Sequence, residues 1–368
     1  MTLSTIRTAI LGYGVSGACF HGPILARQPG YTVAAVVSRN AARVAADFPD
    51  ATVFPDLDTL LAGHRAGTIG IDLCIVATPN RQHAAMARQC LAAGCHVVVE
   101  KPFVIDVDEG QALIDQARAA GKCLSVYHSR RWDGDFLTIQ ALLASGRIGR
   151  VHTWIAHFDR YRPDIHDRWR ERDEPGAGIL YDLGAHLIDQ ALLLFGRPDT
   201  VDARLRRQRP GARAVDYFHL ILGYPDRDVI LHGGCLVNGA GPRFQIFGDR
   251  GSYIKSGIDP QEEFLRAGKG PGSPGYGVAP LGSDGQCTID EAGDEAGDEA
   301  GDEAGRIVQT PWPTATGCYQ QFYCQLADAI RGTAPVPVTA DSALDVIRVI
   351  DAACRSHDQG RRIAMASP

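Results

Sequence analysis

The segment GYGVSG at residues 12–17 follows a short apolar run, residues 6–11, and opens a helical pattern over residues 16–27. The spacing GxGxxG at a strand-to-helix turn allows a tight turn and leaves the backbone amides bare at the start of the helix. Such a helix start attracts phosphate, because its N–H groups and the helix dipole both favour negative charge. We therefore expect the pyrophosphate of a dinucleotide at Gly12, Tyr13, Gly14, Val15, Ser16 and Gly17.

Strand and helix patterns alternate through the first third of the chain. Apolar strands are predicted at residues 6–11, 31–37, 71–77, 96–99 and 124–127, and helices at residues 16–27, 41–47, 81–93 and 107–120. A βαβ series of this kind builds a parallel sheet with helices on both faces, in the α/β class. We predict a doubly wound Rossmann domain over residues 1–125.

The pattern changes in the rest of the chain. A helix is predicted at residues 181–195, followed by strand patterns at residues 201–205, 215–224, 229–237 and 243–255, and a last helix at residues 342–355. Consecutive strands without crossover helices indicate a largely antiparallel sheet, in the α+β class. We predict a second domain over residues 126–368 for substrate binding and oligomerisation.

An acidic repeat interrupts this second region. Residues 290–305 read DEAG four times and carry eight carboxylates, so that without them the net charge of −6 would become +2. Residues 286–306 are interpreted as a low-complexity, solvated acidic loop, because such a composition cannot bury a core. The near-neutral remainder has no basic footprint for nucleic acid or for a membrane surface.

Location and metal content follow from what the sequence lacks. No apolar stretch approaches the roughly 18 residues that span a bilayer, and no signal peptide pattern opens the chain, which favours a cytoplasmic protein. The ten cysteines are scattered without CxxC or zinc-ligand spacing and are interpreted as reduced thiols. His152 and His157 are an odd number of residues apart on a predicted strand and face opposite sides, so no metal site is expected.

Polar residues follow each of the predicted parallel strands, at the edge where doubly wound sheets bind ligands. After the second strand, Ser38 and Arg39 stand where an NAD enzyme usually has a carboxylate for the ribose. This turn favours the 2′-phosphate of NADP, although NAD is possible and Arg39 could be an ordinary exposed arginine. Further cofactor contacts are expected from the residues after the next two strands, namely Thr78, Pro79, Asn80, His83, Glu100 and Lys101.

Three residues carry candidate chemistry. The chain has four lysines against 33 arginines, which makes Lys101 at a strand end more informative than a lysine would otherwise be. Asp182 and His186 are four residues apart and share one face of the predicted helix. A carboxylate can orient an imidazole and raise its proton affinity, as a base near neutral pH requires. Taken alone, the pair could equally be surface decoration.

The motifs GYGVSG, ATPNRQH at residues 77–83, EKP at residues 100–102 and DLGAH at residues 182–186 together resemble the Gfo/Idh/MocA family of oxidoreductases. This resemblance covers nearly the whole chain. It implies that Lys101 lies near the reacting hydroxyl and that Asp182 and His186 complete the catalytic group. It also implies that the second domain's sheet has an open face buried in a homodimer or higher homo-oligomer.

Four further segments resemble the NADP-dependent scyllo-inositol dehydrogenase branch of that family: HSRRWDGDF, HFDRYRP, DRWRE and GSYIKSGIDPQEE. We expect a small polyol substrate bound by donors and aromatic faces at Arg131, Trp132, Arg160, Tyr161 and Trp169. The same arginines and aromatic residues could suggest a nucleic-acid patch, which the near-neutral charge disfavours. A redox glycosidase, another carbonyl reductase or a non-catalytic nucleotide sensor remain alternatives.

Overall fold

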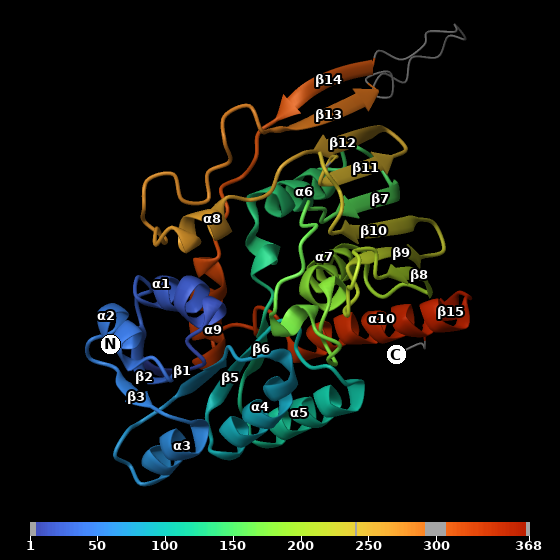
Figure 1. Cartoon of the computed structure of the whole chain (residues 1–368). Helices are drawn as coiled ribbons and strands as arrows, with labels where there is room; N and C mark the ends of the chain where they lie inside the picture. Colours follow the sequence, from blue (N-terminus) through green and yellow to red (C-terminus); the bar gives the residue numbers. More distant parts are fainter. Residues whose placement is uncertain (1–4, 240, 291–306, 366–368) are drawn as a thin grey trace, which may run out of the picture. The chain divides into compact units, whose positions relative to one another are not determined.

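A computed structural model describes residues 5–239, 241–290 and 307–365 (Figure 1). The chain divides into two compact units. Unit 1 contains the described residues of Met1–Trp132, Pro260–Tyr276 and Cys318–Arg348, and unit 2 those of Asp133–Asp259, Gly277–Gly317 and Val349–Pro368. Each unit carries its own sheet.

Unit 1 is built on a six-stranded sheet in the order β3-β2-β1-β4-β5-β6, in which all the pairs are parallel. Its strands are β1 (Ile6–Leu11), β2 (Tyr31–Val37), β3 (Thr52–Phe54), β4 (Leu73–Val76), β5 (His96–Glu100) and β6 (Leu124–Tyr127). The helical segments are η1 (Ser16–His21), α1 (Gly22–Leu25), α2 (Ala41–Asp47), α3 (Leu57–Arg65), η2 (Asn80–Gln82), α4 (His83–Ala92), α5 (Val107–Ala119), η3 (Ser129–Trp132), α8 (Gln261–Arg266) and α9 (Gln320–Ile330). Figure 1 shows α4 and α5 side by side. The predicted doubly wound parallel sheet is confirmed.

Unit 2 is built on a nine-stranded sheet in the order β14-β13-β12-β11-β7-β10-β9-β8-β15. Its strands are β7 (Val151–His157), β8 (Thr200–Arg206), β9 (Tyr217–Gly223), β10 (Asp228–Gly234), β11 (Phe244–Gly248), β12 (Gly251–Lys255), β13 (Gly285–Asp290), β14 (Ile307–Trp312) and β15 (Ile363–Ala364). The helical segments are α6 (Gly134–Ala144), η4 (Trp169–Glu171), η5 (Leu180–Gly184) and α7 (Ala185–Phe195), and α10 (Ala340–Gln359) divides between the units. Among the described strands, β7 and β10 pair in parallel and the other pairs are antiparallel, so the predicted sheet type is confirmed.

The two units are each made of three segments of the chain, whereas the sequence predicted a single boundary between residues 125 and 126. After that point the chain returns to unit 1, because α9 buries aromatic side chains there. The Phe322 ring centroid lies 5.8 Å from that of Trp132 and 5.0 Å from that of Tyr127, and Tyr323 lies 5.5 Å from Tyr31. Long-range aromatic packing of this kind leaves no local sign in the sequence.

Two element predictions in unit 2 need correction. The single strand predicted at residues 243–255 is a hairpin, because the chain reverses at Asp249 and Arg250 and β11 pairs with β12. The acidic segment predicted as loop from residue 286 begins inside β13, which pairs with β14 through residue 290 (Figure 1). The rest of the repeat, residues 291–306, lies outside the described residues.

One buried carboxylic acid in α6 is expected to make stability depend on pH. Asp135 is 3% exposed, and burial, with the nearby charge of Asp133, raises its pKa to about 7, although Arg243 and Lys255 oppose the shift. In the unfolded chain the pKa of this group is about 3.8, so the folded state binds the proton more tightly. The stability contributed by this difference is fully present below pH 3.8 and is lost as the pH rises to about 7.

We expect Asp135→Asn to flatten this dependence. The free energy of unfolding of the unmodified protein should fall by roughly 1 to 3 kcal/mol more than that of the variant between pH 5 and pH 8. Urea unfolding at four pH values measures the difference, with Asp358→Asn as a matched change at an exposed aspartate. Parallel pH profiles for the unmodified protein and Asp135→Asn would contradict the assignment.

Candidate active site

The glycine loop after β1 has the shape that a pyrophosphate requires. Gly12 adopts φ +96°, and a Cβ there would lie 2.8 Å from the carbonyl oxygen of Ala77. A Cβ on Gly17 would overlap the carbonyl oxygen of Gly12, so the helical segment can approach β1 only with glycine at this position. At Gly14 a Cβ would meet no described atom within 4 Å, which leaves the backbone open to a ligand. The loop therefore fits the diphosphate of a dinucleotide.

Two residues of the glycine loop, Tyr13 and Val15, differ in their exposure to solvent. The Tyr13 side chain is 7% exposed and its hydroxyl donates to Asp47 Oδ2 at 2.8 Å, which ties the loop to α2. Val15 is 52% exposed, and Ser16 begins the helical segment η1. Among the predicted loop residues, Val15 and Ser16 thus stand at its open side, whereas Tyr13 contributes by holding the loop.

The turn after β2, residues 38–40, contains the guanidinium group of Arg39 and no carboxylate. Ser38 Oγ accepts from the Asn40 amide at 3.0 Å, and Asn40 Oδ1 accepts from the Arg43 amide at 3.1 Å, which caps α2. Arg39 is exposed, and the Arg43 guanidinium lies 5.8 Å from the Tyr13 ring centroid. Sequence reasoning did not single out Arg43, although its place in the first turn of α2 could have suggested it. Two cations at this turn suit a phosphate better than a ribose diol.

His83 connects the loops after β4 and β5. It is fully buried, with Nδ1 at 2.9 Å from the Pro102 carbonyl oxygen and Nε2 at 2.9 Å from the Thr78 carbonyl oxygen. Burial is the largest influence on this imidazole and lowers its pKa. Asn80, in the same turn, is 7% exposed. The sequence prediction treated His83 as a cofactor contact, and its ring instead meets backbone oxygens of two loops, so it positions them.

Glu100 at the end of β5 organises the backbone of Lys101. Its Oε2 accepts from the Lys101 amide at 3.0 Å, and its Oε1 lies 3.0 Å from His21 Nε2. The other ring nitrogen of His21 lies 2.5 Å from the hydroxyl of Tyr323. Burial would raise the pKa of Glu100, but the hydrogen bond and charge of His21, with the charge of Lys101, outweigh burial and lower it. The ionised carboxylate therefore fixes the main chain at Lys101, whose side chain is half-buried.

His21 and Tyr323 are two residues of this network that sequence reasoning missed. They are 302 positions apart, and no local motif links them. Both belong to unit 1, as does Lys101. The one sequence signal for this network was a histidine, His21, within the helix predicted after the glycine loop.

In unit 2, Asp182 lies in η5 and His186 in the first turn of α7. The predicted continuous α-helix at residues 181–195 is therefore π-helical where Asp182 lies. The Asp182 carboxylate is 3.5 Å from Arg160 Nη2 and 3.3 Å from Arg170 Nε. His186 is 8% exposed, and its ring centroid lies 6.5 Å from that of Phe158. His186 is thus buried, whereas Asp182 is half-buried and paired with two arginines.

A cavity in unit 2 contains Asp182 and is rich in hydrogen-bond donors. Arg160, Arg162, Arg168, Arg170 and Arg209 contribute to its lining together with Asp182. Its volume is about 20 Å³, room for about one water molecule, and the carboxylates of Asp182 and Glu171 pair with four of these guanidinium groups. Arg160, predicted as a substrate contact, is thus placed beside Asp182.

The other predicted substrate residues are distributed over both units. The Trp169 ring lies 4.5 Å below the Arg170 guanidinium, and Tyr161 is 55% exposed. In unit 1, Arg131 donates to Ser342 Oγ at 3.2 Å, and Trp132 is 7% exposed against Phe322. Within unit 2, the structure therefore brings Trp169 close to Asp182 through Arg170, whereas Tyr161 is largely exposed to solvent.

Comparisons with known proteins identify the family. The Gfo/Idh/MocA model described as "Oxidoreductase family, NAD-binding Rossmann fold" matches residues 6–128, and the model described as "Oxidoreductase family, C-terminal alpha/beta domain" matches residues 140–365. The scyllo-inositol 2-dehydrogenase (NADP(+)) IolW of Bacillus subtilis is 40% identical over 99% of this chain and 97% of the relative. The oxidoreductase YdgJ of Escherichia coli is 40% identical over 98% of this chain and 99% of its own length.

Solved structures agree as well. The structure of the oxidoreductase yvaA from Bacillus subtilis matches with a TM-score of 0.91 and 39% identity, over 100% of both chains. An oxidoreductase structure from Yersinia pestis matches with a TM-score of 0.89 and 41% identity, over 99% of this chain and 98% of that one. In the described residues, no helix is both long and apolar enough to cross a membrane. The chain belongs to the Gfo/Idh/MocA family of oxidoreductases and is an NAD(P)-dependent dehydrogenase.

Proposed function

We propose that this enzyme uses NADP(H) and interconverts a secondary hydroxyl and a ketone on an inositol or sugar-like polyol. The observation that carries the substrate class is the full-length similarity to a relative named as an NADP-dependent scyllo-inositol 2-dehydrogenase. Further support comes from the cluster of Asp182 with Arg160 and Arg170, which offers charged hydrogen-bonding groups to hydroxyl oxygens.

Each candidate residue has a distinct role in this proposal. His186 accepts the proton of the reacting hydroxyl as a general base. Lys101 donates a charged hydrogen bond to the same oxygen and stabilises negative charge that develops there. Asp182 orients His186 and holds Arg160 for the substrate. When bound, the nicotinamide cofactor supplies the acceptor for the hydride that leaves the carbon.

A substrate panel tests the proposal. The absorbance of reduced nicotinamide is followed with NADP and NAD, against inositol stereoisomers and common sugars, in the purified full-length protein. We expect turnover with at least one polyol and NADP. Tight cofactor binding without turnover on any polyol would favour a nucleotide sensor, and turnover restricted to glycosides or to non-polyol carbonyls would favour the other two alternatives.

The turn after β2 predicts the cofactor preference. A charge-assisted contact from Arg39 to the 2′-phosphate contributes about 1.5 to 3 kcal/mol, so we expect roughly 10- to 150-fold preference for NADP over NAD in kcat/KM. Ser38→Asp combined with Arg39→Ala should invert it, because the new carboxylate accepts from the ribose hydroxyls of NAD and repels phosphate. Both proteins are compared with both cofactors at one ionic strength. A preference for NAD in the unmodified protein would remove Arg39 from this role.

We also propose a cytoplasmic homodimer or higher homo-oligomer. Support comes from the sheet of unit 2, where the side chains of β9 alternate between buried and half-exposed, so that one face is left partly open. Ile221 and Ile230 lie on the half-exposed face. Light scattering during gel filtration tests this, and a monomer at micromolar concentration would contradict it.

A further inference from the structure

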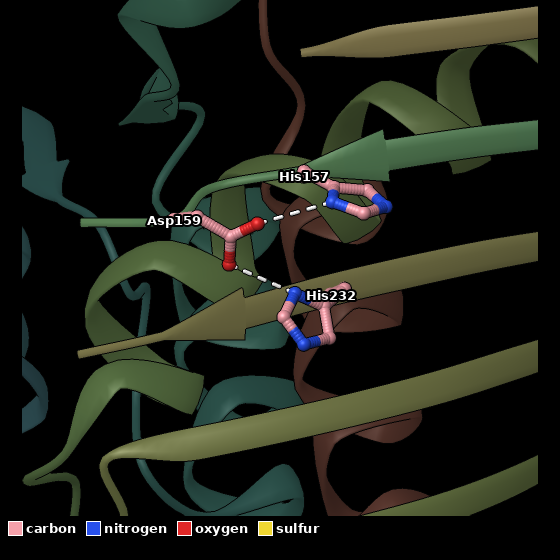
Figure 2. A group of neighbouring side chains, drawn as sticks. All are labelled: His157, Asp159 and His232. Carbon is pink, nitrogen blue, oxygen red and sulfur yellow. Dashed lines mark hydrogen bonds and ion pairs between the residues drawn. The ribbon is translucent and has the colours of Figure 1, made fainter. Parts of the chain in front are cut away.

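Three potential metal ligands meet at the end of the parallel strand pair in unit 2 (Figure 2). His157 is the last residue of β7, and His232 lies directly opposite it on β10. Asp159 follows β7 by two residues. Its Oδ2 lies 3.0 Å from His157 Nδ1, and its Oδ1 lies 2.8 Å from His232 Nδ1.

The carboxylate of this group is buried. The Asp159 side chain is 4% exposed, compared with 28% for His157 and 17% for His232. In the part of the chain that the structure describes, the ion-pair partners of Asp159 are these two imidazoles, with no arginine or lysine among them. A buried carboxylate beside two imidazoles, without a cationic side chain, offers ligand atoms to a bound cation.

The ligand atoms also have suitable spacing. One nitrogen from each imidazole and one carboxylate oxygen all lie within 4.8 Å of one another. Zinc binds imidazole nitrogen and carboxylate oxygen at about 2.0 to 2.2 Å, which places neighbouring ligand atoms about 3 to 3.5 Å apart in a tetrahedron. The two nitrogen-to-oxygen distances, 3.0 and 2.8 Å, go to different oxygens of the carboxylate and are slightly shorter than this spacing. His219, opposite His232 on β9, has its ring centroid 5.9 Å away and is near enough to approach a fourth position.

We propose that His157, Asp159 and His232 bind one divalent transition-metal ion of the zinc class. The ion binds Nδ1 of each neutral imidazole, whose proton is then on Nε2, and its positive charge offsets the negative charge of the buried carboxylate. It joins the ends of β7 and β10 next to Phe158, which lies against His186, and Arg160, which binds Asp182. Its role is to hold this segment, and it does not touch the reacting atoms. The proposal stands independently of the substrate assignment above.

Metal binding by the full-length protein tests the proposal directly. The protein is stripped with a chelator and titrated with Zn²⁺ by calorimetry, and the bound metal is counted by elemental analysis after dialysis. We expect one ion per chain. Because loss of an outer-shell partner alone weakens metal binding 10- to 100-fold, Asp159→Asn and His232→Gln should each weaken it by at least about 100-fold. His152→Gln changes an exposed histidine that faces the opposite side of the same strand from His157; it is the matched control and should bind normally.

Co²⁺ provides a second readout that identifies the ligands. A nitrogen and oxygen site gives visible d–d bands without thiolate charge transfer, which separates this site from the chain's cysteines. The melting temperature of the unmodified protein and of His152→Gln should rise with Zn²⁺, and that of Asp159→Asn should not. Absence of binding by the stripped unmodified protein, equal binding by all variants, or a thiolate band would each overturn the proposal, and the first outcome would leave the group as a hydrogen-bonded carboxylate only.

Discussion

Replacing His186 by Asn is expected to lower kcat by about 10² to 10⁴, the usual contribution of a positioned general base. Asn keeps a polar group of similar size in this buried position but cannot accept the hydroxyl proton. The affinity for NADP should change little, because the proposed contacts to its phosphate groups come from the turns after β1 and β2, which do not include His186. Steady-state kinetics with the polyol found in the substrate panel and fluorescence titration of NADPH measure the two effects.

A control variant, His166→Asn, distinguishes a specific role of His186 from a general effect of replacing a histidine. His166→Asn changes an exposed histidine of unit 2 and should leave kcat within a factor of a few. Loss of NADPH binding in His186→Asn would indicate a general structural effect. Turnover close to that of the unmodified protein would remove His186 from proton transfer, and another base would have to be sought.

Lys101→Met should remove on the order of 2 to 4 kcal/mol of transition-state stabilisation, the range observed for loss of one oxyanion donor. The corresponding loss in kcat/KM is about 30- to 1,000-fold. The main chain should remain in place, because Glu100 holds the Lys101 amide and His21 holds Glu100. Methionine is also of similar length, so the change removes chiefly the charged donor.

Two further variants distinguish a positioned donor from a general positive charge. Lys101→Arg should not restore activity, because the planar guanidinium places its donors differently from an ammonium group. Lys269→Met, at an exposed lysine of unit 1, is the matched control and should be fully active. An active Lys101→Arg enzyme would show that position 101 contributes charge alone.

The Rossmann unit could be predicted closely because its signals are local. GYGVSG adopts the expected turn, with Gly12 at positive φ and Gly17 against the Gly12 carbonyl. Short apolar runs between helical patterns have few alternatives to a parallel sheet. The sequence analysis omitted β3 and α3, since a strand of three residues leaves little periodicity to detect.

In the candidate site, the motifs in the sequence indicated which residues to consider, but not which side chains they contact. Lys101, Asp182 and His186 stood out by motif, and each is partly or fully buried. The carboxylate of Asp182 has two arginine partners that lie 12 and 22 positions away, and Lys101 depends on a network that reaches Tyr323. His83 was predicted to face the cofactor and instead binds two backbone carbonyls. Contacts of this kind arise from packing and cannot be deduced from spacing along one element.

The sequence by itself determined the glycine turn and the alternation of the first sheet, and it suggested the residue types of the proposed catalytic group, since these depend on neighbours within about 20 positions. Only the tertiary structure decided which strands of unit 2 lie side by side. His152 is the one other histidine in β7, and it faces the opposite side of the strand from His157, so β7 alone shows no metal site. Because β10 pairs in parallel with β7, a histidine 75 positions away meets His157 across the ladder. Strand order is set by burial of the whole sheet face, a long-range property that no segment of the sequence carries alone.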